Sequence, residues 1–264
     1  MAARDLFSLE GRTALVTGGS RGIGKMIARG YLEAGARRVY ISSRKAADCE
    51  ATAKELGEAC IALPQDVSTV EGVQALAQAM AAREEGLDIL VNNAGAAWAA
   101  PFDEFPESGW DKVMNLNVKS PFFLTQALHG MLKKAASPQR PAKVINVASI
   151  DGIFLNPLET YSYHASKSAL IYLTRRMAAT LVKDQILVSA IAPGAFASSM
   201  NRAARDHADV VAKAVPQGRI GRDDDMAGVA IYLASRAGDY VVGATIPVDG
   251  GVALASLPAV GAAG

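Results

Sequence analysis

The sequence predicts an α/β fold: a doubly wound, seven-stranded parallel sheet with helices on both faces, built as one domain over residues 1–264. Three observations predict it. Short and almost continuous apolar runs alternate along the chain with longer segments that carry apolar residues at helical spacing. Strands that are apolar on both faces are typical of parallel sheets covered by helices on each side. No internal repeat and no linker-like stretch divides the chain into parts.

Seven segments have the composition of buried strands. They are rich in Val, Ile, Leu and Ala and occupy residues 13–17, 38–42, 59–63, 88–92, 143–147, 186–191 and 245–248. The first runs directly into a cluster of glycines, as expected where a strand ends in a tight turn. The stretch 135–142, AASPQRPA, comes closest to a linker, but its place in the alternation indicates a helix-to-strand loop.

The segments between these strands have helical periodicity. The predicted helices cover residues 23–34, 46–56, 70–83, 110–134, 163–183, 200–213 and 224–235. Gly35 is the expected stop of the first helix. The last begins in a run of three aspartates, and we expect Asp223 to act as its N-cap, because an Asp side chain accepts hydrogen bonds from free N–H groups.

Composition excludes several classes of protein. The chain has 27 Lys and Arg against 26 Asp and Glu, a net charge of +1, which argues against nucleic acid or a membrane surface as a partner. Its apolar runs are far shorter than the ~20 residues that span a bilayer. The segment MAARDLFSLEGR lacks the apolar core of a secretory signal, and Cys49 and Cys60 have no metal-ligand spacing. We therefore expect a cytoplasmic protein with reduced cysteines and no metal.

The turn after the first strand has the form of a phosphate site. Residues 17–24 read TGGSRGIG and lie between a strand and a helix, where glycines let backbone N–H groups approach a pyrophosphate, as in Rossmann folds. The same residues contain Gly-x-Ser-x-Gly, the nucleophile elbow of α/β-hydrolases. That alternative is disfavoured, because none of His129, His164 and His207 is flanked like a triad base and the elbow normally follows a mid-sheet strand.

Three motifs in this order resemble the short-chain dehydrogenase/reductase family. They are TGGSRGIG at 17–24, NNAG at 92–95 and Tyr163-x3-Lys167. Ser149 and Asn117 complete the catalytic tetrad of that family, and the resemblance extends to VDGG at 248–251. It is strongest to the 3-oxoacyl-[acyl-carrier-protein] reductases of fatty-acid and rhamnolipid synthesis.

The resemblance implies a role for each member of the tetrad. Tyr163 would be the general acid, with a pKa lowered by Lys167 one helical turn on and by the oxidised nicotinamide. Lys167 would also bind the ribose hydroxyls, and Ser149 would stabilise charge on the substrate oxygen. Asn117 would hold a water that links Lys167 to solvent. Tyr161 lacks a lysine four residues on, and His164 would face another side of the helix as a surface or interface residue.

The charge near the predicted ribose favours NADP(H) over NAD(H). An acidic residue ~20 positions after the glycines binds both ribose hydroxyls in NAD proteins, but here that place holds Arg44, next to Ser43. A guanidinium suits a 2′-phosphate, and Arg21 could reach the same group. The alternative is that Arg44 only begins a surface helix.

The cofactor-binding set follows from the glycine turn and the resemblance together. The resemblance adds an adenine contact at Asp66 and Val67, and it places a hydroxyl of Ser198 where the family usually has Thr. The full set is Gly18, Ser20, Arg21, Gly22, Ile23, Gly24, Ser43, Arg44, Asp66, Val67, Asn93, Ala94, Gly95, Tyr163, Lys167, Pro193, Gly194, Phe196 and Ser198.

These observations favour an NADPH-dependent carbonyl reductase that acts on 3-oxoacyl thioesters, small or carrier-bound. An NAD(P)-dependent dehydrogenase of a small alcohol, sugar or steroid remains an alternative, as does a non-catalytic nucleotide sensor. A substrate lid is expected near 197–215, around Met200, Arg202 and Arg205. The apolar excess of 113–132 and 168–182 predicts a homotetramer or homodimer. The apolar tail after Gly251 would be disordered or packed on another subunit.

Overall fold

The computed structural model describes residues 3–198 and 201–256. It contains one parallel sheet in the order β3-β2-β1-β4-β5-β6-β7. The strands are β1 (Thr13–Thr17), β2 (Arg38–Ser42), β3 (Cys60–Ala62), β4 (Ile89–Asn92), β5 (Ala142–Val147), β6 (Ile186–Pro193) and β7 (Thr245–Val248). Each corresponds to a predicted strand, so the predicted seven-stranded, doubly wound sheet is confirmed; only β3 is clearly shorter than expected.

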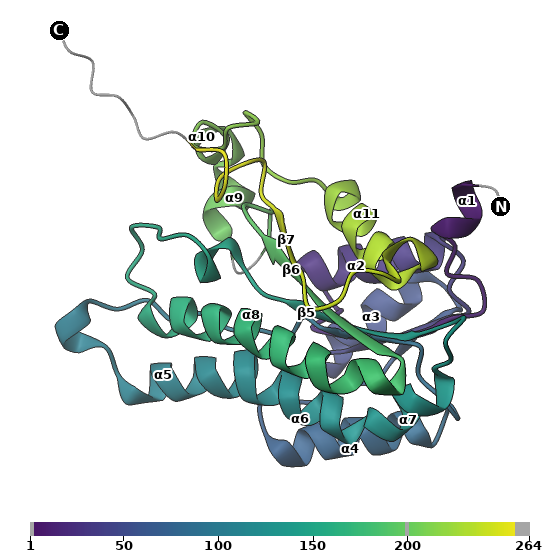
Figure 1. The fold of residues 1–264 in the computed structure, drawn as a ribbon. Helices are drawn as coiled ribbons and strands as arrows, with labels where there is room; N and C mark the ends of the chain where they lie inside the picture. The colour runs from purple at the N-terminus through teal and green to yellow at the C-terminus, as the bar shows by residue number, and fades with distance from the viewer. Residues whose placement is uncertain (1–2, 199–200, 257–264) are drawn as a thin grey trace, which may run out of the picture.

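Helices cover both faces of the sheet (Figure 1). On one face lie α4 (Val70–Ala81), α5 (Glu107–Met114), α6 (Ser120–Ala127), α7 (His129–Ala135) and α8 (Tyr161–Leu181). The other face carries α2 (Gly22–Glu33), α3 (Ala46–Leu56) and α11 (Asp223–Ala234). The short α1 (Ala3–Leu6) precedes the sheet, and α9 (Arg202–Asp206) and α10 (Ala208–Ala212) stand above it. None of the described helices is both long and apolar enough to cross a membrane.

Neighbouring residues of each strand enter different hydrophobic cores. Leu15 of β1 packs with Leu90 and Val144 against the α4 and α8 side, whereas Val16 packs with Ile27 of α2 and Met226 of α11 on the other. All are buried, which is why the strand sequences are apolar at every position rather than at alternate ones.

The predicted helix over 110–134 is interrupted. A π-helical turn (Asn115–Lys119) separates α5 from α6, and Leu128 separates α6 from α7. The Ser120 N–H donates to the Asn115 carbonyl five residues back, and Pro121 has no N–H to donate. The carbonyls of Leu116 and Asn117 therefore lose the donors that an α-helix would supply. Such turns are often found at functional sites.

Two other helical predictions also need correction. The segment predicted as one helix over 200–213 forms the short α9 and α10, which meet at His207, and residues 199–200 with Met200 lie outside the described residues. The prediction that Asp223 caps α11 is wrong, since Asp223 is its first helical residue and Arg222 is the N-cap. Asp225 performs the capping instead, because its carboxylate accepts the Arg222 N–H at 2.8 Å. The tail 257–264 also lies outside the described residues.

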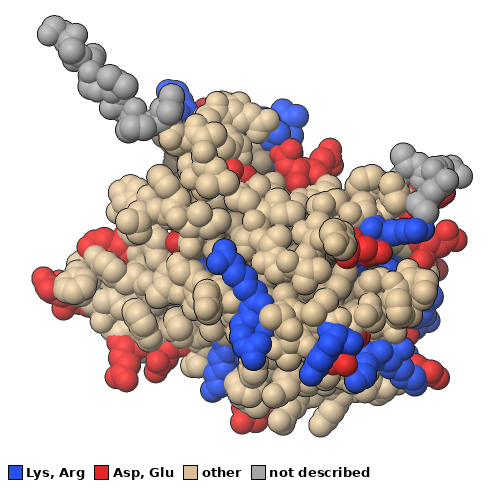
Figure 2. Space-filling view, viewed as in Figure 1, with Lys and Arg blue, Asp and Glu red and all other residues tan. Residues whose placement is uncertain are grey.

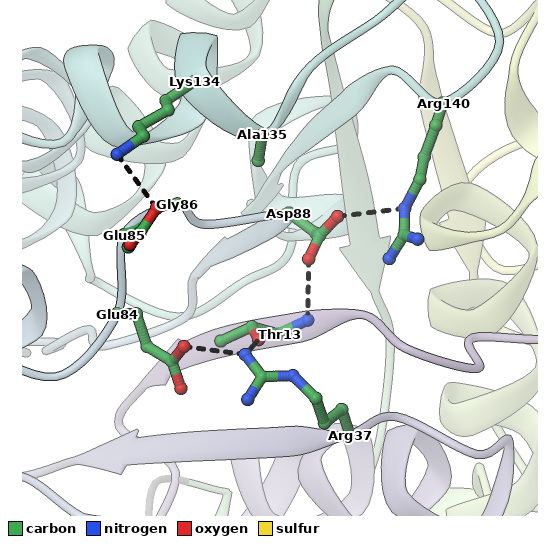
Figure 3. Close-up of a pocket in the computed structure, with 9 residues that line it drawn as sticks. All are labelled: Thr13, Arg37, Glu84, Glu85, Gly86, Asp88, Lys134, Ala135 and Arg140. Carbon is green, nitrogen blue, oxygen red and sulfur yellow. Dashed lines mark hydrogen bonds and ion pairs between the residues drawn. The ribbon is translucent and has the colours of Figure 1, made fainter.

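A charged hollow of about 430 Å³ lies at the amino ends of β1 and β4 (Figure 3). Asp88 accepts the backbone N–H of Thr13 at 2.8 Å and forms ion pairs with Arg140 at 3.2 Å and Arg12 at 3.5 Å. Glu84 pairs there with Arg37 at 2.7 Å. The opposite charges of this hollow neutralise one another, and its place at the amino ends of the strands indicates a structural network rather than a ligand site.

Candidate active site

The predicted site residues gather at the carboxyl edge of the sheet. There β1 has β2 on one side and β4 on the other, so the chain leaves β1 and β4 in different directions and opens a crevice between them. In doubly wound folds such a point is where ligands bind. Thr17 of β1 and Ser42 of β2 are direct neighbours in register, which brings the loops after them together.

The glycine turn after β1 has no room for side chains. A Cβ on Gly24 would lie 2.3 Å from the Gly18 carbonyl oxygen and 2.5 Å from the Asn93 side chain, and Gly18 has a φ of +65°. Asn93 donates to the carbonyls of Thr17 at 2.8 Å and Gly18 at 3.2 Å, so its amide holds the turn in place. Gly22 and Ile23 begin α2. A backbone cradle of this kind at a helix N-terminus fits a dinucleotide phosphate.

Two unpaired arginines flank this cradle. The Gly19 N–H donates to the Ser42 carbonyl at 3.2 Å, so the turn that holds Arg21 lies beside the segment that leads to Ser43 and Arg44. Both guanidiniums belong to exposed residues, and neither forms an ion pair within 3–198 and 201–256. Two free cations beside the cradle are consistent with a site for an additional phosphate group.

The remaining predicted cofactor residues border the same crevice. The Gln65 N–H donates to the Ser43 carbonyl at 3.0 Å. Asp66 and the buried Val67, which follow Gln65, therefore lie close to Ser43 in space. Pro193 ends β6, and a Cβ on Gly22 would lie 3.3 Å from Ser198, so the segment after β6 reaches the glycine turn. Gly194 packs against Asp249, and Thr52 ties Ser20 to α3 at 2.8 Å. The Phe196 side chain is buried in the core, which leaves only its backbone for a ligand.

The structure brings Tyr163, Lys167 and Ser149 together. Lys167 Nζ lies 5.5 Å from the centre of the Tyr163 ring and donates to the Val147 carbonyl at 2.8 Å. Lys167 is only 4% exposed and Ser149 6% exposed. Ser149 follows β5, and its hydroxyl accepts the Asp151 N–H at 3.1 Å. A phenol, an ammonium and a hydroxyl are thus collected at the end of one strand.

Asn117 reaches the same group from the π-helical turn. A Cβ on Gly95 would lie 3.3 Å from Asn117 Oδ1 and 3.8 Å from Lys167 Nζ. The Asn117 amide makes three hydrogen bonds: Oδ1 accepts the Ala96 N–H at 2.8 Å, while Nδ2 donates to the Ala96 carbonyl at 2.9 Å and to Ser166 Oγ at 3.0 Å. This side chain therefore clamps the loop after β4.

Burial shifts the pKa values of the two titratable members in opposite directions. It raises the pKa of Tyr163 to about 12, a shift that a hydrogen bond from Ser149 opposes and the charge of Asp151 adds to. It lowers the pKa of Lys167 to about 8, and here Asp151 opposes the shift. In these surroundings Tyr163 is a protonated phenol at neutral pH, able to donate a proton. The lowered pKa expected from the sequence also needs the positive nicotinamide, and it stays a prediction.

Sequence reasoning missed three residues of this site. Thr17 Oγ1 accepts the N–H groups of Asn93 and Ala94, each at 3.0 Å, and so fixes the loop after β4 to β1. Ser166 Oγ donates to the Tyr163 carbonyl at 2.8 Å while it accepts from Asn117. The third is Asp151. Thr17 and Ser166 lie inside the motifs 17–24 and 163–167, and a polar residue two positions after Ser149 was a visible signal for Asp151.

An apolar hollow of about 580 Å³ lies between the loop after β4 and the start of α8. Its lining residues are Phe102, Phe105, Trp110, Leu155, Asn156, Leu158, Tyr161 and His164. The Tyr161 ring makes edge-to-face contacts with two phenylalanines, at centroid distances of 5.5 and 5.7 Å. Asn156 connects the hollow to the turn after Ser149, because it donates to Asp151 at 2.7 Å. Figure 2 shows a mostly uncharged surface over the loop before α8, with acidic side chains at the edge where α5 begins.

His164 is half-buried in this hollow rather than a surface residue. Its Nδ1 contacts Thr160 at 3.0 Å, and its Nε2 is buried without a partner among the residues that the structure describes. Within the same described residues, no group of three or more His, Cys, Asp or Glu could hold a metal ion.

Comparison with known proteins relates this arrangement to enzymes. A family model described as Enoyl-(Acyl carrier protein) reductase matches residues 18–253. The rhamnolipids biosynthesis 3-oxoacyl-[acyl-carrier-protein] reductase of Pseudomonas aeruginosa is 48% identical over 250 residues, 93% of this chain and 97% of that protein. The 2-dehydro-3-deoxy-D-gluconate 5-dehydrogenase of Dickeya dadantii is 39% identical over 248 residues, 93% and 96% of the two chains. The solved Pseudomonas aeruginosa RhlG/NADP active-site complex has a TM-score of 0.91 at 48% identity and covers 95% of this chain and 99% of that one.

Proposed function

The chain belongs to the short-chain dehydrogenase/reductase family of oxidoreductases, and on this premise we propose that it reduces ketones with NADPH. The substrate class we propose is a 3-oxoacyl thioester, which would become the 3-hydroxyacyl product. The observation that carries the proposal is the convergence of Tyr163, Lys167 and Ser149 beside a glycine cradle that fits a dinucleotide.

NADPH supplies the hydride for the substrate carbon, and the residues of the chain hold the reactants and provide the proton. Tyr163 donates its phenolic proton to the carbonyl oxygen. Burial raises the pKa of this phenol to about 12, and the positive charges of Lys167 and of the oxidised nicotinamide would lower it toward the range that suits a general acid. Ser149 donates a hydrogen bond to the oxygen as charge develops there. Lys167 would bind the ribose of the cofactor. Asn117 holds the loop that carries Gly95 close to Lys167.

The two unpaired arginines support NADP(H) as the cofactor. Arg44 and Arg21 would meet the 2′-phosphate, and no acidic residue takes the place that binds a bare 2′-hydroxyl. The solved relative at 48% identity is a complex with NADP, which agrees with this choice. The other cofactor residues proposed from the sequence border the crevice as described above.

The apolar hollow supports an acyl chain over a sugar as the substrate. A polyhydroxylated substrate needs several hydrogen-bond partners, whereas the lining of this hollow is mainly aromatic rings and leucines. We also propose that 197–215 forms a lid of the single domain, since Ser198 lies against the glycine turn and α9 and α10 stand above the sheet. The buried free thiols of Cys49 and Cys60 suit a reducing compartment such as the cytoplasm.

We propose that the chain assembles as a homotetramer or homodimer. Tyr172 of α8 is 72% exposed and Phe122 of α6 is 39% exposed, so large rings remain on the outer sides of helices whose other sides are buried in the sheet core. Pairing of like helices about a two-fold axis would cover them. Light scattering at micromolar concentration tests this, and a monomer of 27.5 kDa would contradict it.

Steady-state NADPH oxidation tests the proposed activity. We expect 3-oxoacyl thioesters to be reduced with a kcat/KM that rises with the length of the acyl chain, because a longer chain buries more apolar surface in the hollow. The same assay is run with 5-ketogluconate, a substrate of the kind that the name of the Dickeya relative suggests. Turnover of the sugar acid alone would refute the acyl assignment, and cofactor binding with no turnover of either would favour the nucleotide sensor.

A further inference from the structure

Asp151 lies in a 3₁₀ turn (Ile150–Gly152) directly after Ser149. The turn is pressed against α8: a Cβ on Gly152 would lie 2.7 Å from the carbonyl carbon of Lys167, and Ser168 donates to the Gly152 carbonyl at 3.1 Å. On its other side the Asp151 N–H donates to Ser149 Oγ at 3.1 Å. The backbone of Asp151 is therefore held between the residue that would contact the substrate oxygen and the helix that carries Tyr163 and Lys167.

Among the described residues, the Asp151 carboxylate forms no direct ion pair. Its hydrogen-bond partner is the neutral amide of Asn156 at 2.7 Å, and no Lys or Arg within residues 3–198 and 201–256 forms an ion pair with it. Its charge acts on both reacting groups, since it contributes to the pKa values of Tyr163 and Lys167. Asp151 is only half-exposed, so water screens this charge less than it would at the surface.

We propose that Asp151 is a specificity-determining residue that disfavours substrates with a carboxylate near the reacting carbonyl and thereby favours neutral esters and thioesters. The proposal rests on the proposed function, because it concerns the substrate of that same site. A sugar acid would bring a second negative charge next to the Asp151 carboxylate, which has no direct ion pair among the described residues, whereas a 3-oxoacyl thioester is neutral around its ketone.

The test compares 3-oxobutanoate with its ethyl ester. The first has a negative carboxylate and the second a neutral ester group at the same distance from the ketone. Asp151→Asn removes the charge but keeps an oxygen that can accept from Asn156. We expect the kcat/KM of the anion relative to that of the ester to rise about tenfold, because the variant removes the repulsion between two negative charges. Asp151→Glu retains the charge and should retain the wild-type ratio.

Glu58→Gln is the matched control for net charge. Glu58 is exposed in the turn before β3, at the opposite edge of the sheet, so its variant should leave the ratio unchanged. High salt should raise the anion-to-ester ratio of kcat/KM more in the wild type than in Asp151→Asn, because only the wild type has a charge at position 151 for salt to screen. A purely structural role of Asp151 would lower both activities together and leave the ratio unchanged, and that result would overturn the proposal.

Failure of the acyl assignment can be separated from failure of the Asp151 proposal. If the wild type reduces neither 3-oxo compound, the same ratio is measured in the oxidation direction with NADP, gluconate and the neutral sorbitol. A tenfold rise of the gluconate-to-sorbitol ratio in Asp151→Asn would then support the role of Asp151 while the acyl assignment falls. An unchanged ratio, or no turnover of any of the four compounds, would refute the role of Asp151.

Discussion

Replacement of Lys167 by Met tests the electrostatic state of the site through stability rather than activity. Burial lowers the pKa of Lys167 from 10.5 to about 8 in the nucleotide-free protein. The difference of about 2.5 pKa units corresponds to about 3 kcal/mol, and a residue only 4% exposed needs no large correction for solvent screening. This free energy is the cost of burying the protonated amine, and the neutral amine does not carry it.

The direction of the pH dependence follows from proton binding. Between pH 8 and pH 10.5 the unfolded chain binds more protons at this lysine than the folded chain, so the wild type gains stability as the pH rises through this range. Below pH 8 the burial cost is fully present. Lys167→Met lacks this titration, and we expect the wild type to gain about 2 kcal/mol relative to the variant between pH 7 and pH 10.

Urea unfolding of the nucleotide-free protein at several pH values measures this difference. The comparison of slopes cancels the hydrogen bond to the Val147 carbonyl and any cavity that the variant leaves, because neither depends on pH. Lys183→Met removes an exposed lysine just beyond α8 and serves as the control, which should follow the wild type. Parallel stability curves for the wild type and Lys167→Met would refute the account of a buried, charged lysine.

Three further predictions concern the choice of cofactor, the identity of the general acid and the stability of the fold. Arg44→Asp should weaken NADPH binding and improve NADH binding by roughly tenfold to a hundredfold, because a charge-assisted hydrogen bond is worth about 1.5–3 kcal/mol. Fluorescence titration measures the affinity for each cofactor, and an unchanged preference for NADPH over NADH would contradict the role of Arg44. Tyr163→Phe should keep its affinity for the cofactor but lose turnover by ~10²-fold or more. Tyr161→Phe should keep its turnover, because it loses only an exposed hydrogen bond to Glu159 at 3.1 Å. The reverse result would assign the general acid to Tyr161. Asp88→Asn should lower the free energy of unfolding by about 3 kcal/mol, because the guanidinium of Arg12, 7% exposed, loses its counter-charge and keeps only the Pro141 carbonyl at 2.9 Å. A change below about 1 kcal/mol in urea unfolding would show that Arg12 does not depend on Asp88.

The positions of the strands and of the cofactor turn were readable from local sequence. A strand buried on both faces must be apolar at consecutive positions, and a backbone that approaches a phosphate must be glycine, so both features leave their mark within a few residues. The pairing of Tyr163 with Lys167 was equally local, since one helical turn separates them. Arg44 could be found because its distance from the glycines is set by one helix and one strand.

Helix interruptions were not readable in this way. The periodicity of 110–134 continues through the π-helical turn, because the apolar residues still face the sheet; only the missing N–H of Pro121 hints at it. Asp223 looked like a cap, but Arg222 takes that place and Asp225 reaches back to it, a difference of one residue that depends on where the chain enters the helix.

By itself, the sequence determined the class of fold and the positions of the strands along the chain, because buried strands and helices leave local patterns of apolar residues. The order of the strands in the sheet pairs β1 with β4, which lie far apart in the sequence, and was not predicted. Ser149 and Asn117 were identified through the resemblance to a family. Only the tertiary structure decided what those residues face. Burial by distant segments raises the pKa of Tyr163 and commits the Asn117 amide to Ala96, and the fold brings the charge of Asp151 close enough to act on Lys167. Such surroundings come from segments far apart in the sequence, since desolvation and charge act through space and not along the chain.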